Sequence, residues 1–370
     1  MPTPSASDLL ERGDTEREQS RFEEALGTYR RAEALFRPAG DLEGITICRL
    51  SKGHCLRLIG RFGQALAEYR AAESRASELG DLYSVADAVV GQGMSVRALW
   101  DIPEALHQFE RAVGLYRNLD DEAGEAYVLW ASGGALRVRG ALGEAFEAFE
   151  ESRLRYEGLK DRQGIVYALC GLGGISRVMG RYHDSLDYYS RANARLRRGS
   201  DRFGRAYSYC GRANARRMLG DFAESHELFD RARTLYHEIG DRVSYAYTVW
   251  GEATAHKMQG RNEAAADGFR EADALFKATR DARGRAYVAL GQGEIHLLSG
   301  RSGRAASLFT RAGDLAARHG LQLEALHAEL LQGLLRRYEG ERVSFNGLAR
   351  RYERLGSSFL DAPSLPLNLP

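Results

Sequence analysis

The apolar and polar positions of this 370-residue chain recur with a period of forty residues. In each unit a small residue is followed four positions later by an aromatic residue and three positions after that by another small residue, as in Ala65, Tyr69 and Ala72. Offsets of three, four and seven residues place these side chains on one face of an α-helix. The spacing returns from Ala25 to Ala312, so it predicts eight copies of this helix.

A preceding helix in each unit is delimited by aspartate and glycine. Aspartate recurs at Asp41, Asp81, Asp121, Asp161, Asp201, Asp241 and Asp281, and glycine at Gly60, Gly140, Gly180, Gly220, Gly260 and Gly300. Aspartate is a favoured N-cap and glycine a favoured C-terminal stop, which predicts a first helix of about sixteen residues. One such helix pair cannot bury its apolar stripe alone, so the units are expected to stack. The predicted fold is an all-α solenoid of stacked antiparallel helix pairs.

These residues resemble the tetratricopeptide repeat family. The segment Gly180-Arg-Tyr-x2-Ser185-Leu-x2-Tyr189-x2-Ala192 is similar to the turn and second helix of that family, and Gly53, Gly93, Gly133, Gly173 and Gly293 match its first-helix glycine. The forty-residue unit is similar to the longer variant in Pins-type adaptors and in the sensor domains of MalT-type bacterial regulators. The resemblance covers about residues 5–340 and implies a right-handed superhelix. It is specific for fold and much less so for function.

The ends of the chain depart from the repeat. Residues 1–356 are predicted to form the solenoid, with eight forty-residue units, the first of them shortened, and a C-terminal capping helix pair. Residues 357–370 form an extended tail that contains Pro363, Pro366 and Pro370. Proline keeps the tail extended, and its apolar residues make it a poor solvated linker. We therefore expect the tail, with its carboxylate at Asp361, to dock on a solenoid surface of its own chain or of a neighbour.

Composition narrows the possible functions. The chain is 44% apolar, and 52 basic residues against 51 acidic ones give a net charge of +1, which provides no bulk attraction to nucleic acid or to an anionic membrane. Four cysteines without a CxxC pair and scattered histidines without an HExxH motif indicate no metal site. No apolar run is long enough for a membrane span. The sequence predicts a cytoplasmic protein without catalytic residues or cofactors.

The first helix of each unit places its candidate binding residues on one face. Projected at 100° per residue, positions equivalent to 47, 50, 51, 54, 57 and 58 share one face, and the family resemblance implies that this face lines a concave, peptide-binding groove. A tyrosine column and a basic column overlap there in the central repeats. The tyrosine column consists of Tyr127, Tyr167, Tyr207, Tyr247 and Tyr287, and the basic column of Arg17, Arg57, Arg97, Arg137, Arg177, Arg217 and Lys257. The predicted partner-binding residues are Tyr127, Trp130, Arg137, Tyr167, Arg177, Tyr207, Asn214, Arg217, Tyr247, Trp250 and Lys257. In the same arc, Gly134 and Gly174 leave room, whereas Asn214, Thr254 and Glu294 offer hydrogen bonds.

Each column has two interpretations. The arginines either read carboxylates of a ligand or pair with acids and carbonyl groups of the neighbouring helix. The tyrosines either contact apolar ligand side chains or pack between repeats.

The favoured function is a scaffold or adaptor that binds an extended peptide with acidic and apolar side chains. The alternatives are a peptide-sensing regulatory module, single-stranded nucleic-acid binding through the Arg/Tyr ladder, and an accessory subunit of an enzyme complex. The balanced charge and the scarcity of lysine weigh against nucleic acid.

Overall fold

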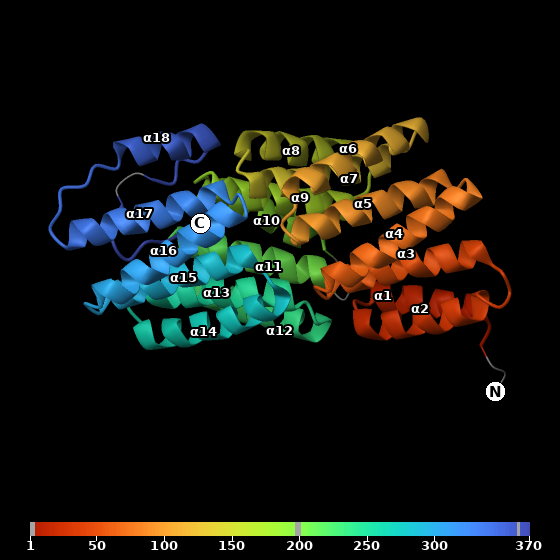
Figure 1. The fold of residues 1–370 in the computed structure, drawn as a ribbon, viewed down its shortest axis with the longest axis horizontal. Helices are drawn as coiled ribbons and strands as arrows, with labels where there is room; N and C mark the ends of the chain where they lie inside the picture. Colours follow the sequence, from red (N-terminus) through yellow and green to blue (C-terminus); the bar gives the residue numbers. More distant parts are fainter. Residues whose placement is uncertain (1–3, 197–200, 361–362) are drawn as a thin grey trace.

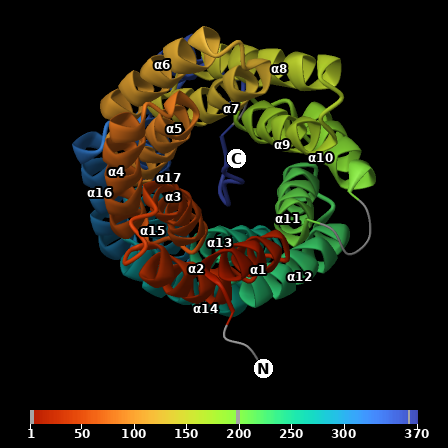
Figure 2. The same ribbon diagram turned by 90° about the vertical axis from the view of Figure 1, so that its right-hand side faces the viewer.

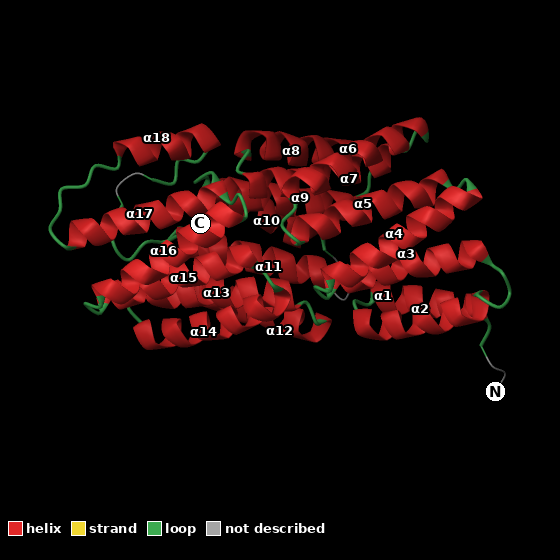
Figure 3. Ribbon diagram, viewed as in Figure 1, coloured by secondary structure: helices red, strands yellow, loops and turns green. Residues whose placement is uncertain are grey.

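The structure is a computed structural model that describes residues 4–196, 201–360 and 363–370. Within these ranges the chain forms eighteen α-helices and no strands (Figure 3), as the sequence predicts. The helices are α1 (Ala6–Glu18), α2 (Phe22–Phe36), α3 (Leu42–Leu58), α4 (Phe62–Leu79), α5 (Leu82–Ala98), α6 (Ile102–Asn118), α7 (Glu122–Arg139), α8 (Leu142–Gly158), α9 (Arg162–Val178), α10 (Tyr182–Arg195), α11 (Arg202–Met218), α12 (Phe222–Ile239), α13 (Arg242–Met258), α14 (Asn262–Thr279), α15 (Ala282–Leu298), α16 (Ser302–Arg318), α17 (Gln322–Tyr338) and α18 (Asn346–Leu355).

The helix pairs wind into a right-handed superhelix (Figure 1). Seen end-on in Figure 2, the odd-numbered helices from α3 to α17 form an inner ring, and the even-numbered helices from α4 to α16 form an outer ring around it. Each first helix of a pair therefore presents one face to the inside of the superhelix. We call the inward faces of α3, α5, α7, α9, α11, α13 and α15 the inner wall.

The repeated aspartates and glycines set the helix boundaries. Asp41 caps α3 by accepting the backbone N–H of Gly44 at 2.8 Å, and the other six aspartates of the column cap their helices in the same way. Gly60 and Gly180 follow first helices with φ angles of +78° and +88°. This left-handed conformation suits glycine and ends the helix where the next one must reverse direction.

The aromatic column joins each pair to the next one. The ring of Tyr69 fills the space that glycine leaves in both neighbouring first helices: a Cβ atom on Gly53 would lie 2.9 Å from the ring, and one on Gly91 would overlap it. Ala65 and Ala72 are completely buried beside it. One small-aromatic-small stripe thus supplies the packing both within a pair and between pairs.

Successive turns of the superhelix also touch. Ile59 packs with Tyr236 and Ile239 in one apolar cluster. The hydroxyl group of Ser357 donates to the carbonyl oxygen of Val178, 179 residues earlier, at 2.8 Å. The first residue of the tail is therefore fixed to the middle of the solenoid.

The C-terminal end lies inside the superhelix, as the position of the C label in Figure 2 shows. After α18, residues 357–359 contact α9 and α17, and Leu367 and Leu369 are buried in the largest apolar cluster. Asp361, which the sequence suggested as an anionic group of the tail, is outside the described residues. No helix in the described part of the chain is both long and apolar enough to cross a membrane.

Candidate functional site

The basic column follows a constant register along the inner wall. Arg97, Arg137 and Lys257 each lie against the residue thirty-seven positions later, which is on the next first helix. Arg97 donates to the carbonyl oxygen of Ala131 at 3.3 Å and covers Gly134, where a Cβ atom would overlap the guanidinium group. In the equivalent pair farther along, Lys257 forms an ion pair with Glu294. We call each residue of the basic column a rung. The residue that lies against a rung on the next first helix thus determines what that rung can bind.

Five rungs have no acidic partner among the described residues: Arg57, Arg97, Arg137, Arg177 and Arg217 form no ion pair there, although thirty-one ion pairs form elsewhere. The Nε atoms of Arg57, Arg137 and Arg177 and the Nη1 atom of Arg177 are buried and have no hydrogen-bond partner. Burial lowers the pKa of Arg97 to about 10, with a smaller contribution from the nearby charge of Arg137. Unpaired buried cations are costly, so this column is well suited to receive anions.

The C-terminal residues satisfy the basic groups of Arg217, the last of these five, and of Lys257, which follows it in the column. The guanidinium group of Arg217 donates to the side-chain oxygen of Asn368 and, at 3.0 Å, to the carbonyl oxygen of Leu369. The Nδ2 atom of Asn368 donates in return to the carbonyl oxygen of Arg217 at 2.9 Å. Lys257 donates to the carbonyl oxygen of Leu367 at 2.7 Å. Three successive residues of an extended segment are thus bound through backbone groups and one amide side chain.

Glu294 completes this arrangement. One carboxylate oxygen accepts the Leu367 N–H at 2.6 Å, while the other pairs with Lys257. Both charges are almost fully buried, and burial lowers the pKa of Lys257 and raises that of Glu294. Their mutual attraction opposes both shifts. The pair therefore presents one donor and one acceptor to the backbone of a single peptide residue.

Arg217 is held by two more of the predicted residues. Its guanidinium group lies 5.5 Å from the ring centroid of Trp250 and donates to the Asn214 side chain at 3.2 Å. Arg217 is 0% exposed, which is unusual for a side chain on the inner wall. The physical reason is the tail, which covers Arg217 and makes it part of a buried contact.

The tyrosine column serves contacts between neighbouring pairs. The hydroxyl groups of Tyr167 and Tyr247 each donate at 3.2 Å to the N-cap aspartate of the next pair, Asp201 and Asp281. The hydroxyl group of Tyr127 donates to the sulfur atom of Met94 at 3.0 Å. These three hydroxyl groups thus have partners within the solenoid.

The remaining aromatic residues of the predicted set pack against their neighbours. Trp130 stacks on Tyr127 with ring centroids 5.8 Å apart and donates to the carbonyl oxygen of Tyr167 at 3.0 Å. Tyr207 meets Tyr189 edge-on at 6.2 Å. The structure therefore brings Asn214, Arg217, Trp250 and Lys257 together around the C-terminal residues, whereas Arg137 and Arg177 belong to the unpaired stretch.

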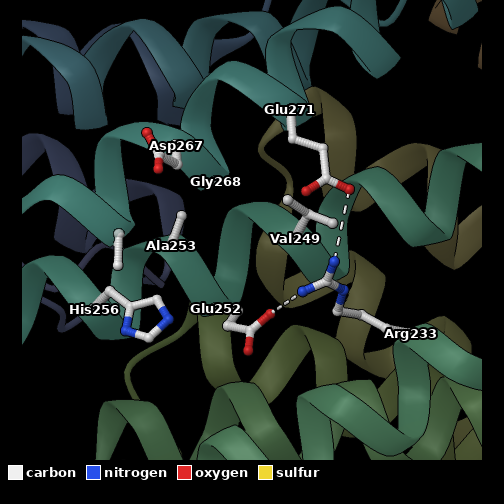
Figure 4. Close-up of a pocket in the computed structure, with 9 residues that line it drawn as sticks. Arg233, Val249, Glu252, Ala253, His256, Asp267, Gly268 and Glu271 are labelled. Atoms are coloured by element: carbon white, nitrogen blue, oxygen red, sulfur yellow. Dashed lines mark hydrogen bonds and ion pairs between the residues drawn. The ribbon is translucent and has the colours of Figure 1, made fainter.

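A separate shallow pocket of about 190 Å³ lies among α12, α13 and α14 (Figure 4). His226, Glu252 and His256 each place one potential ligand atom within 4.8 Å of the others. Arg233 already binds Glu252 at 2.8 Å, and Arg261 contacts the Nε2 atom of His226. Two arginines so close disfavour a cation, so this cluster is a weaker candidate site than the inner wall.

Residues 164–238, from the start of α9 to the end of α12, match the tetratricopeptide repeat family. This match falls on two helix pairs, α9–α10 and α11–α12, and the other helix pairs of the chain stack in the same way. The matched segment consists of tetratricopeptide repeats. No curated protein sequence matches it.

Solved structures with a similar fold are tetratricopeptide solenoids of comparable length. A Rap protein complexed with competence and sporulation factor has a TM-score of 0.59 and 13% identity, over 94% of this chain and 99% of that one. The Rap conjugation regulator of plasmid pLS20, in complex with the Phr* peptide, has a TM-score of 0.65 and 13% identity over 86% and 97%. Aspartyl phosphate phosphatase F from Bacillus subtilis has a TM-score of 0.58 and 11% identity over 85% and 94%. At these identities the likeness establishes the fold.

The predicted set omits residues that the structure places at the centre of the site. Glu294 was noted only as a hydrogen-bonding residue of the arc, and Leu367, Asn368 and Leu369 only as part of an apolar tail. The register of thirty-seven residues between Lys257 and Glu294 is a sequence signal that finds this ion pair. Nothing in the sequence pattern indicates which repeat the tail contacts.

Proposed function

We propose that this protein is a non-catalytic scaffold that binds an extended peptide with acidic and apolar side chains along its inner wall. The observation that carries the proposal is the basic column, in which four half-buried arginines, Arg57, Arg97, Arg137 and Arg177, have neither an acidic partner nor a contact with the C-terminal residues in the described structure. Carboxylates of a ligand would supply the missing acceptors. Arginine forms bidentate contacts with carboxylates, so each rung fixes a side chain in place.

The way in which the C-terminal residues lie supports an extended ligand. Lys257, Arg217 and Glu294 contact main-chain groups of Leu367 and Leu369, and the side chains of these two leucines are buried. Main-chain recognition combined with pockets for alternate side chains is typical of extended-peptide binding. The helices are rigid, so mainly the peptide loses conformational entropy on binding.

The structural neighbours support peptide binding and favour a second candidate. One similar solenoid is a Rap protein in complex with competence and sporulation factor, and another is a Rap regulator in complex with the Phr* peptide. A peptide-sensing regulatory module, in which the peptide changes the pitch of the superhelix, is therefore the second function that we consider. Both candidates place the peptide on the inner wall, in the cytoplasm, and differ in whether binding changes the superhelix.

Single-stranded nucleic acid fits the observations less well. Tyr127, Tyr167 and Tyr247 would have to release their present partners to stack on bases. The net charge of +1 adds no long-range attraction.

Selection from a random peptide library tests the proposal. Dodecamer peptides are displayed to the chain truncated after Leu360, and the selected sequences are then compared with those selected by the same chain carrying Arg137→Gln and Arg177→Gln. We expect enrichment of Asp and Glu together with leucine for the parent, and loss of the acidic enrichment for the double variant. Arg139→Gln with Arg181→Gln, which removes two arginines outside the column, is the matched control. No enrichment, acidic enrichment that survives the double substitution, or binding only of oligo-dT with a steep salt dependence would reject the proposal.

A further inference from the structure

We infer that residues 363–370 are a tethered occupant of the peptide site, and that the external ligand of its α11–α15 part is an extended peptide with two leucines flanking one amide residue. This inference rests on the proposed function and specifies both the ligand and its regulation. We call residues 363–370 the C-terminal segment. Its sequence is Pro-Ser-Leu-Pro-Leu-Asn-Leu-Pro.

The contacts of the C-terminal segment resemble those of a bound peptide. Leu367 and Leu369 are 6% and 2% exposed, whereas Ser364, on the same segment, is exposed. Both leucines belong to the largest apolar cluster, so they enter the wall together. Asn368 between them exchanges two hydrogen bonds with Arg217. These groups specify leucine, an amide residue and leucine in that order.

The receiving side is built of charged groups that require an occupant. Arg217, Lys257 and Glu294 are each at most 1% exposed, and each donates to or accepts from the C-terminal segment. Without it, the Lys257 ammonium group loses its acceptor on Leu367, and Arg217 loses both Asn368 and Leu369. Desolvated charges without these partners are costly, so the site favours any segment that offers the same backbone and amide groups.

The C-terminal segment can leave without dismantling the solenoid. The chain is anchored separately just before it: Ser357 and Ser358 donate to the carbonyl oxygens of Val178 and Met179 at 2.8 and 3.0 Å, and Phe359 meets His327 edge-on at 5.6 Å. Between this anchor and Leu367, the described residues make one hydrogen bond, from Arg337 to the Pro363 carbonyl oxygen at 3.4 Å. Release of residues 363–370 therefore leaves the helix pairs and the first anchor in place.

Tethering makes the C-terminal segment a competitor. A short tether holds it near the wall at an effective concentration of roughly millimolar, so an external peptide with the same contacts binds only when the segment is displaced. The prolines at 363, 366 and 370 restrict the backbone of the free segment and so lower the entropy lost on docking. The segment thus sets an affinity threshold that excludes weak peptides from this part of the wall.

Fluorescence anisotropy with a labelled peptide of the sequence of residues 363–370 tests the inference. The probe is titrated with the full chain and with the chain truncated after Leu360. We expect the truncated chain to bind the probe at least tenfold more tightly than the full chain. Arg217→Gln in the truncated chain should weaken binding at least tenfold, and a scrambled probe should not bind. Equal affinity for both chains, or binding that Arg217→Gln leaves unchanged, would overturn the inference.

A point variant in the full chain controls for the possibility that truncation itself disturbs folding. Leu369→Lys in the full chain places a cation beside Arg217 and is expected to raise probe affinity as truncation does. Ser364→Lys adds the same charge at an exposed position of the C-terminal segment and should leave probe affinity at the wild-type level. Equal affinities for the two variants would contradict the tethered occupant.

Two further readouts separate this inference from its alternatives. If peptides selected from the library bind the truncated and full chains equally well, the scaffold function stands and the tethered occupant is rejected. If the probe binds the truncated chain but no library peptide does, the scaffold function fails. If the full chain sediments as a dimer and the truncated chain as a monomer, the C-terminal segment occupies the site of a second copy. This result would overturn tethering within one chain.

Discussion

The basic column runs through two stretches of the inner wall that differ in what lies against them. In α3–α9, Arg57, Arg97, Arg137 and Arg177 form no ion pair among the described residues; Arg97 donates to a backbone carbonyl group and Arg57 is hydrogen-bonded to Tyr69. In α11–α15, the basic groups bind the C-terminal segment. The repeat geometry is the same in both stretches, so the difference comes from the partner groups. The occupied stretch shows what the open stretch lacks.

The residue that lies against the basic side chain also differs between the two stretches of the basic column. Gly134 and Gly174 leave space in which the guanidinium groups of Arg97 and Arg137 lie against the next helix. At the far end, Glu294 neutralises Lys257 and also accepts a peptide N–H. In the open stretch, negative charge has to come from a ligand. In the occupied stretch Glu294 supplies it for Lys257, whereas Arg217 binds neutral groups of Asn368 and Leu369.

The largest expected effect belongs to the built-in pair. Lys257→Met leaves Glu294 buried without its cation, which should lower the free energy of unfolding by about 3–5 kcal/mol. Urea denaturation followed by circular dichroism measures this change. The matched double variant, Lys257→Met with Glu294→Met, removes both charges and should recover most of the loss. A single variant as stable as the wild type would mean that the two stretches do not differ in the way described.

The fold could be predicted from the sequence because the same helix-capping and packing residues recur every forty residues. Aspartate caps, glycine stops and the small-aromatic-small stripe act within one or two helix pairs, so a local pattern determines them. The all-α solenoid of tetratricopeptide type is confirmed.

The site could be predicted only in part, because its contacts are not periodic. The columns identified Arg217 and Lys257 as inner-wall residues, but their contacts to residues 367–369 join parts of the chain more than a hundred residues apart. No repeat encodes such a contact. The tyrosine hydroxyl groups, in contrast, make periodic contacts. Tyr167 and Tyr247 each donate to an aspartate of the forty-residue repeat that lies thirty-four residues later in the chain.

The anchor of the occupied stretch should be sensitive to acid. Burial lowers the pKa of His327 to about 4, with Arg283 acting in the same direction and Glu324 opposing it, and its Nδ1 atom is 2.7 Å from the Tyr352 hydroxyl group. The unfolded chain then binds the proton more tightly than the folded protein. Stability is therefore complete above about pH 6.5 and falls as the pH drops toward 4, by about 3 kcal/mol for this group.

Urea denaturation between pH 4 and pH 7 measures this dependence. His327→Gln, which keeps a hydrogen-bonding group near Tyr352, should lose about 3 kcal/mol of the change between the two ends of the range. His183→Gln, on the outer helix α10, is the control and should keep the wild-type slope. Identical slopes for wild type and His327→Gln would show that the acid sensitivity lies elsewhere.

The smallest effect should come from adding an acid at the boundary between the stretches. Asn214 already accepts from Arg217, and it follows Arg177 by the same thirty-seven residues that separate Arg137 from Gly174. Asn214→Asp should weaken acidic peptides roughly tenfold, because the added carboxylate takes the place of one from the ligand. Asn118→Asp adds the same charge at the exposed end of α6, outside the inner wall, and should leave peptide affinity unchanged. Unchanged peptide affinity in Asn214→Asp would contradict the role of the column.

Hydrogen exchange of the C-terminal segment tests the proposed competition for the inner wall most directly. In the free full chain, the Leu367 amide should exchange slowly, because it donates to Glu294. Addition of a saturating peptide selected on the truncated chain should make this amide exchange at the rate of an unstructured segment, while α11 and α13 stay protected. Binding of the peptide with the Leu367 amide still protected would show that ligand and C-terminal segment do not share a site, and would contradict the proposal.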